Sequence, residues 1–69
     1  MKLKYPNIEA ERAKRSMTKA SLCQELNITV KTYRSWQCGR FDISAKHLVK
    51  LAQLFECSAD YLLGLKEER

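Results

Sequence analysis

Apolar side chains recur every three or four residues through much of the chain, and polar residues occupy the positions between them. The pattern is clearest over residues 18–36, which hold two short apolar runs separated by a polar break. The positions expected to face inward are Leu22, Cys23, Leu26, Tyr33 and Trp36. Because this spacing is that of amphipathic helices, the stretch predicts two helices joined by a tight turn, which is a helix-turn-helix layout.

The ends of these two helices are marked by residues with suitable chemistry. Thr18 and Thr29 each precede a helical run, where a threonine hydroxyl can accept a hydrogen bond from a free amide of the first turn. Asn27 tolerates the left-handed backbone that ends a helix, and Ile28 supplies an apolar plug in the turn. We therefore predict that the second helix of the pair begins directly after Thr29.

Another helix is predicted before the pair. Residues 1–6 are expected to form an irregular arm, and Asn7 is the expected N-cap. Lys14 and Arg15 close the helix, where positive charge complements the helix dipole.

Two further helices are predicted after the pair. Gly39 ends the third helix of the chain, and Phe41 and Ile43 are expected to pin the following loop onto the core. Ser44 then caps a fourth helix, which runs over about residues 45–56 with a strong apolar face.

The last predicted helix is short. Ser58 caps it, it runs through Leu63, and Gly64 ends it, while the residues beyond are expected to form a frayed tail. The chain shows no strand pattern and no linker. The sequence therefore predicts an all-α fold, a compact five-helix bundle with a helix-turn-helix, as one domain over residues 1–69 with its core at about residues 7–64.

The net charge of +5 is distributed unevenly. Residues 1–46 hold ten Lys and Arg against four acidic residues, which gives +6, and residues 47–69 hold three against four, which gives −1. A basic portion that contains the helix pair fits a polyanionic partner. The alternative, that the lysines only keep a small protein soluble, is left open by charge alone.

Other classes of protein find little support. The three cysteines form no CxxC pair and His47 is the only histidine, so neither a disulfide framework, a metal site nor a cofactor is expected. No catalytic set and no membrane span is visible, and we expect a cytoplasmic protein that is not an enzyme. Cys23 is expected to be buried, and Cys38 to be either an inert thiol or a redox or metal switch near the helix pair.

Over about residues 8–64, the order and spacing of these residues resemble the DNA-binding domain of the phage repressor and Cro family of bacterial regulators. No single motif is specific, but the ordered set is. The matching positions are Thr18, Leu22, Cys23, Ile28, Thr29, Tyr33, Trp36, Gly39, Leu48, Leu51, Ala52, Phe55 and the run Ser58-Ala59-Asp60-Tyr61-Leu62-Leu63-Gly64. The resemblance implies a lambda repressor-like fold and a sequence-specific transcriptional regulator, typically a repressor of the prophage or mobile-element type.

Five positions depart from the family's pattern, namely Lys19, Asn27, Gln37, Ile43 and Cys57. A lysine at position 19 stands where the family often has a phosphate-contacting glutamine, and it can serve the same phosphate as a point charge. Gln37 stands where a glutamate often pairs with the arginine of the first helix. Arg12 is therefore expected either to bond Gln37 or to be free for the DNA backbone.

The resemblance and the helical wheel together give the expected contacts with bases. They are Val30, Lys31, Arg34 and Ser35. Arg34 suits a guanine, because its fork can donate two hydrogen bonds to O6 and N7. Lys31 could reach a guanine or only a phosphate, and Val30 could pack on a thymine methyl. The alternative is that these four residues are only the solvated face of a bundle helix.

The expected contacts with phosphates are Thr18, Lys19, Thr29, Arg40 and Lys46. The expected partner is double-stranded DNA, bound by a homodimer on a palindromic operator whose half-sites lie about 34 Å apart. Leu63, Leu65 and the fifth helix are the expected dimer contact. The competing hypothesis is a protein-interaction module, such as an antitoxin-like or adaptor protein with the same fold.

Overall fold

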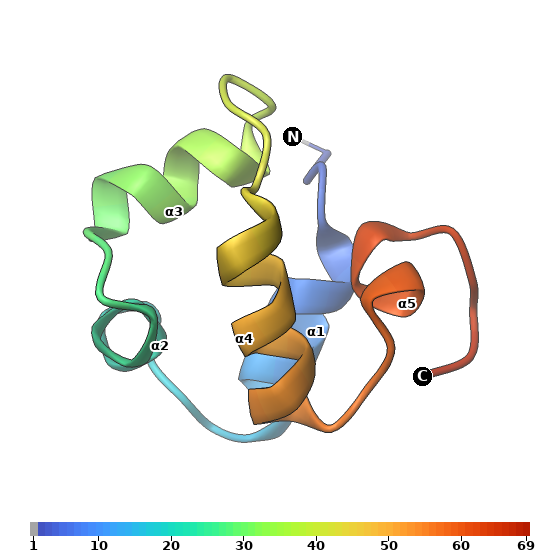
Figure 1. The fold of residues 1–69 in the computed structure, drawn as a ribbon. Coiled ribbons are helices and arrows are strands. Elements are labelled where there is room, and N and C mark those ends of the chain that lie inside the picture. Colours follow the sequence, from blue (N-terminus) through green and yellow to red (C-terminus); the bar gives the residue numbers. More distant parts are fainter. Residues whose placement is uncertain (1) are drawn as a thin grey trace.

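The computed structural model describes residues 2–69, and in this part of the chain all regular structure is helical. Figure 1 shows the helices winding around a common centre, with α3 and the loop that follows it at one end of the molecule. The all-α helical bundle predicted from the sequence is confirmed. The helices are α1 (Pro6–Lys14), α2 (Lys19–Leu26), α3 (Val30–Gln37), α4 (Ala45–Phe55) and α5 (Ala59–Leu63).

Each of the last four helices begins at a hydroxyl side chain that accepts a hydrogen bond from the first turn. The predicted caps of the helix pair are confirmed, because Thr18 accepts from the Ser21 amide at 3.0 Å and Thr29 from the Thr32 amide at 3.1 Å. Asn27 ends α2 in the left-handed conformation, with φ of 57°. The remaining predicted caps, at Ser44 and Ser58, are also confirmed.

The predicted cap of α1 is wrong. The helix begins two residues earlier than an Asn7 cap would give, with Pro6 in its first turn and Tyr5 at the cap position, which provides no side-chain cap. Proline suits this place because its missing N–H is not needed there and its φ is already helical. The Asn7 side chain instead donates a hydrogen bond to the Tyr61 carbonyl at 2.7 Å, which ties α1 to α5.

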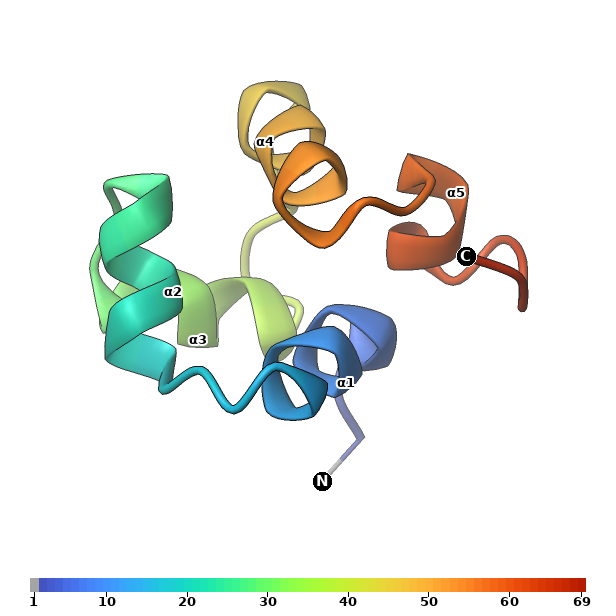
Figure 2. The same cartoon turned by 90° about the horizontal axis from the view of Figure 1, so that it is seen from below.

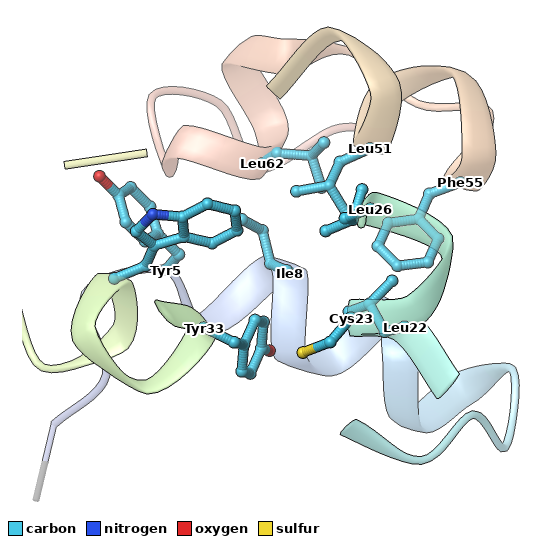
Figure 3. Close-up of a cluster of buried hydrophobic side chains, with 10 residues drawn as sticks. Tyr5, Ile8, Leu22, Cys23, Leu26, Tyr33, Leu51, Phe55 and Leu62 are labelled. Carbon is cyan, nitrogen blue, oxygen red and sulfur yellow. The ribbon is translucent and has the colours of Figure 1, made fainter. Parts of the chain in front are cut away.

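The core draws side chains from every helix and from the arm, as the labelled residues of Figure 3 show. Ile43 packs against this core as predicted, but Phe41 does not, since it is 62% exposed. The amides of Arg40 and Phe41 both bond the Ser35 carbonyl, which turns the loop back on α3. The buried apolar residues are Tyr5, Ile8, Leu22, Cys23, Leu26, Tyr33, Trp36, Leu51, Phe55 and Leu62.

A buried carboxylate joins α1 to the end of the chain. Glu11 is 2% exposed and forms ion pairs with Arg15 and Arg69, and it accepts a hydrogen bond from the Tyr61 hydroxyl at 3.2 Å. Arg69 also donates to the carbonyl of Phe55 at 2.6 Å. The prediction of a frayed tail is therefore wrong at Arg69, because a charged pair formed across the fold holds this residue in place.

Candidate nucleic-acid interface

The third helix presents two chemically different faces. Tyr33, Trp36 and Gln37 are buried beneath it, and Lys31 and Arg34 are exposed on the opposite side. This division follows from the helical repeat, which places residues three or four apart on the same face. The outer face of α3 is therefore basic and open to solvent, while its inner face is fixed to the core.

The other two predicted base-contacting residues are less open. Val30 is half-buried and packs partly against the core, so only part of its surface faces outward. Ser35 is also half-buried, and its hydroxyl donates to the carbonyl of Lys31 at 3.0 Å. Lys31 and Arg34 are therefore the residues of α3 whose side chains extend furthest into solvent.

The five residues predicted to contact phosphates are all exposed. Thr18 and Lys19 lie at the start of α2, Thr29 precedes α3, Arg40 lies in the loop after α3, and Lys46 lies in the first turn of α4. In the sequence, these residues therefore lie both before and after α3.

A hollow of about 260 Å³ brings predicted residues of both kinds together. Its walls include Lys19 of α2 and Arg34 of α3, together with Glu9 and Cys38. Cys38 is exposed and free, as is consistent with its place at the end of α3. The structure thus places a predicted phosphate contact and the main predicted base contact beside the same hollow.

Arg12 does neither of the two things expected of it. It forms a two-point ion pair with Glu9, three residues earlier on α1, with Nε 3.0 Å from Oε1, and it also donates to the Met17 carbonyl. Both expectations are therefore wrong. The acidic partner was visible in the sequence as an i,i+3 pair on one helix.

Gln37 has a role that the sequence analysis missed. Its side chain accepts from the Tyr5 amide at 2.9 Å and donates to the Tyr5 carbonyl at 3.0 Å, so it pairs with both backbone groups of that residue. The Lys4 amide also bonds the Gln37 carbonyl at 2.8 Å. The amino-terminal arm is therefore attached to the end of α3.

A hydrogen-bonded chain of side chains continues from this point to α1. The Tyr33 hydroxyl donates to Glu9 at 2.7 Å and accepts from Gln37 at 3.2 Å. Burial, followed by the bond to Glu9, raises the pKa of Tyr33, and the Arg12 hydrogen bond is the main reason that the pKa of Glu9 is lowered. These bonds fix the orientation of α3 relative to α1.

Replacing Tyr33 with phenylalanine is expected to lower the free energy of unfolding by about 1.5 kcal/mol, the worth of a hydrogen bond to a charged group. The ring still fills its place in the core, and Glu9 keeps Arg12, so the loss is limited to the hydroxyl. Urea unfolding of the variant measures it, with Cys38→Ser as an exposed control on the same side of the molecule. A Tyr33→Phe variant as stable as the parent would contradict the bond to Glu9.

The remaining chemistry of the described residues is limited. Cys23 is buried, which raises the pKa of its thiol, as expected for a structural cysteine between helices. Residues 2–69 hold no group of three or more His, Cys, Asp or Glu side chains that could bind a metal ion. Within that same range, no helix has the length and apolar character needed to cross a membrane.

Two capped helices joined by an Asn27 turn, with the second buried on one face and basic on the other, define a helix-turn-helix DNA-binding domain. The family model described as helix-turn-helix (HTH_3) matches residues 8–62, and the chain belongs to this Cro/C1-type helix-turn-helix family. The protein is thus a DNA-binding transcriptional regulator in general class. Comparisons with curated proteins and with solved structures gave no match.

Proposed function

We propose that the protein is a sequence-specific repressor, of the prophage or mobile-element type, which inserts α3 into the major groove of double-stranded DNA. The observation that carries the proposal is the pair of exposed basic side chains, Lys31 and Arg34, on the outer face of a helix whose opposite face is buried. A helix with this arrangement can enter the groove without unpacking from its own domain.

Base recognition is assigned mainly to Arg34, whose guanidinium can donate two hydrogen bonds to one guanine. Lys31 contacts a neighbouring guanine or a phosphate. Val30 offers its open edge to a thymine methyl, and Ser35 lies close enough to the same groove for a weak polar contact. The half-burial of Val30 and Ser35 supports a smaller share of the discrimination for these two residues.

Backbone contacts are assigned to Thr18, Lys19, Thr29, Arg40 and Lys46, and their exposure on both sides of α3 along the chain supports this assignment. Such contacts set the position of the protein on the duplex, contribute most of the affinity, and make that affinity fall as salt increases.

A homodimer on a palindromic operator is part of the proposal, because one short recognition helix reads few base pairs. The exposed apolar surface near α5 supports a contact there, with Leu65 72% exposed and Leu63 half-buried beside it. Two copies joined through this surface would present two α3 helices to successive major grooves.

The test is selection of binding sites from a random duplex pool, carried out with the full chain at low and at moderate salt. The proposal expects a palindromic site to be enriched, with binding that weakens as salt rises. If no sequence is enriched even at low salt, the proposal fails, and the protein-interaction module becomes the better hypothesis. Capture of a protein partner that persists at high salt would support that module.

A further inference from the structure

A second hollow, of about 200 Å³, lies where the end of α2 meets the beginning of α4. In Figure 2 the end of α2 that leads into α3 lies on the same side of the molecule as α4. The residues that line the hollow are Leu26, Asn27, Lys46, His47 and Lys50. Three of the five come from the first two turns of α4, and they give the hollow a basic wall.

The two lysines of this wall are not balanced by the rest of the domain. Lys46 and Lys50 are four residues apart on α4, a spacing at which like charges repel, and both are exposed. Among residues 2–69, neither lysine forms an ion pair with a carboxylate. The wall therefore has positive charge available for an anion.

Backbone hydrogen bonds close part of the end of α2. The Asn27 amide bonds the Gln24 carbonyl at 3.1 Å and the Ile28 amide bonds the Cys23 carbonyl at 2.9 Å. Lys46 and Lys50 line the same hollow as this end of α2, where positive charge complements the helix dipole.

His47 adds an imidazole ring, held on two sides, to the same wall. Its Nδ1 lies 2.7 Å from the Ser44 hydroxyl, and its ring lies against Trp36 with 5.3 Å between the ring centres. The Ser44 oxygen accepts from the His47 amide at 3.4 Å, and its own hydrogen can point to Nδ1. In the tautomer in which Nδ1 accepts that bond, the ring hydrogen is on Nε2, which has no partner among the described residues.

We propose that this hollow binds a phosphate group, held by the ammonium groups of Lys46 and Lys50 and by Nε2–H of His47. Asn27 closes the opposite side of the hollow, three residues before Val30 begins α3. A DNA strand beside α3 is one source of the phosphate, and in that case the inference rests on the proposed function. A small phosphate compound is the other source, and it has the same chemistry.

The DNA source is tested through Lys50, which the proposed base and backbone contacts do not include. Replacing Lys50 with glutamine is expected to reduce the slope of log affinity against log salt by about 0.9, the value for one phosphate contact. Binding is measured on one fixed duplex at several salt concentrations. The control is Lys66→Gln, which removes an exposed lysine outside the hollow and leaves the slope unchanged.

The small-phosphate source is tested without DNA by adding pyrophosphate to the full chain and following amide resonances by NMR. Saturable chemical-shift changes at Asn27 and in the first two turns of α4 would show that pyrophosphate binds in the hollow. An affinity for pyrophosphate at least about tenfold lower in Lys50→Gln would then establish this source. An unchanged salt slope together with no saturable shift would overturn the proposal. If the chain binds no DNA, only the proposed function is refuted, because the pyrophosphate titration still tests whether the hollow binds a phosphate group.

Discussion

Replacing Glu11 with glutamine is expected to lower the free energy of unfolding by about 3 kcal/mol, because the buried carboxylate is the shared partner of two arginines and a tyrosine hydroxyl. This loss is near the lower end of the range for removing one partner of a buried ion pair. The side chains of Arg15 and Arg69 are 30% and 40% exposed, so they can turn toward water when the carboxylate is removed. A loss of this size is a large share of the stability of a small domain.

The same variant is expected to change the response of the protein to acid. Burial opposes ionisation of Glu11, but hydrogen bonds from Arg15 and Tyr61 and the charge of Arg69 outweigh it and hold its pKa below the ordinary value of 4.5. A lowered folded-state pKa means that the stabilisation is complete above pH 4.5 and is lost as the pH falls further, through the folded-state value. Glu11→Gln should therefore be less sensitive to acid than the parent.

Urea unfolding of parent and variant across the acid range measures both effects. Glu25→Gln is the matched control, because it makes the same chemical change at an exposed position of α2. Equal losses for Glu11→Gln and Glu25→Gln, or an unaltered acid response in the first, would show that the buried ion pairs contribute little.

Replacing Arg34 with alanine is expected to remove preference at one defined base pair of the selected site, at a cost of about 1–3 kcal/mol, or roughly 5- to 150-fold in affinity for that site. The side chain is exposed on α3 and carries no intramolecular ion pair within residues 2–69, so folding should change little. Binding to the selected duplex and to its single-base variants measures the effect.

Two companion measurements separate base reading from simple charge. Arg34→Lys keeps the positive charge but loses the two parallel hydrogen bonds of the guanidinium. Unlike Arg34→Ala, it should show the salt dependence of the parent, but it should still lack the preference at that base pair. Thermal unfolding should show Arg34→Ala to be as stable as the parent. Uniform weakening on every sequence, with no position losing its preference, would make Arg34 a phosphate contact and refute its role as a base reader.

Much of the bundle could be predicted because its signals are local. The caps at Thr18, Thr29, Ser44 and Ser58 act on amides three residues away, and Asn27 ends α2 through its own backbone preference. The candidate groove face could be predicted for the same reason. Once Tyr33 and Trp36 are assigned to the core, the helical repeat leaves Lys31 and Arg34 on the outside.

The errors arose where a neighbouring group decided the outcome. Asn7 has the chemistry of an N-cap, but the proline before it starts the helix earlier and the Tyr61 carbonyl takes its side chain. Phe41 is apolar enough to anchor a loop, yet the backbone bonds to Ser35 leave it exposed. Composition alone does not distinguish these outcomes, because each polar or apolar group has several possible partners.

By itself, therefore, the sequence determined the helices, the starts of the last four, the order of the bundle and the basic outer face of α3, since each depends on residues within about one or two turns. Only the tertiary structure decided which distant groups meet. It paired Gln37 with the backbone of Tyr5, Tyr33 with Glu9, Glu11 with Arg69, and it set Lys46 and Lys50 opposite the end of α2. These pairings depend on how whole helix faces pack against one another, and a helical pattern does not specify which face meets which neighbour.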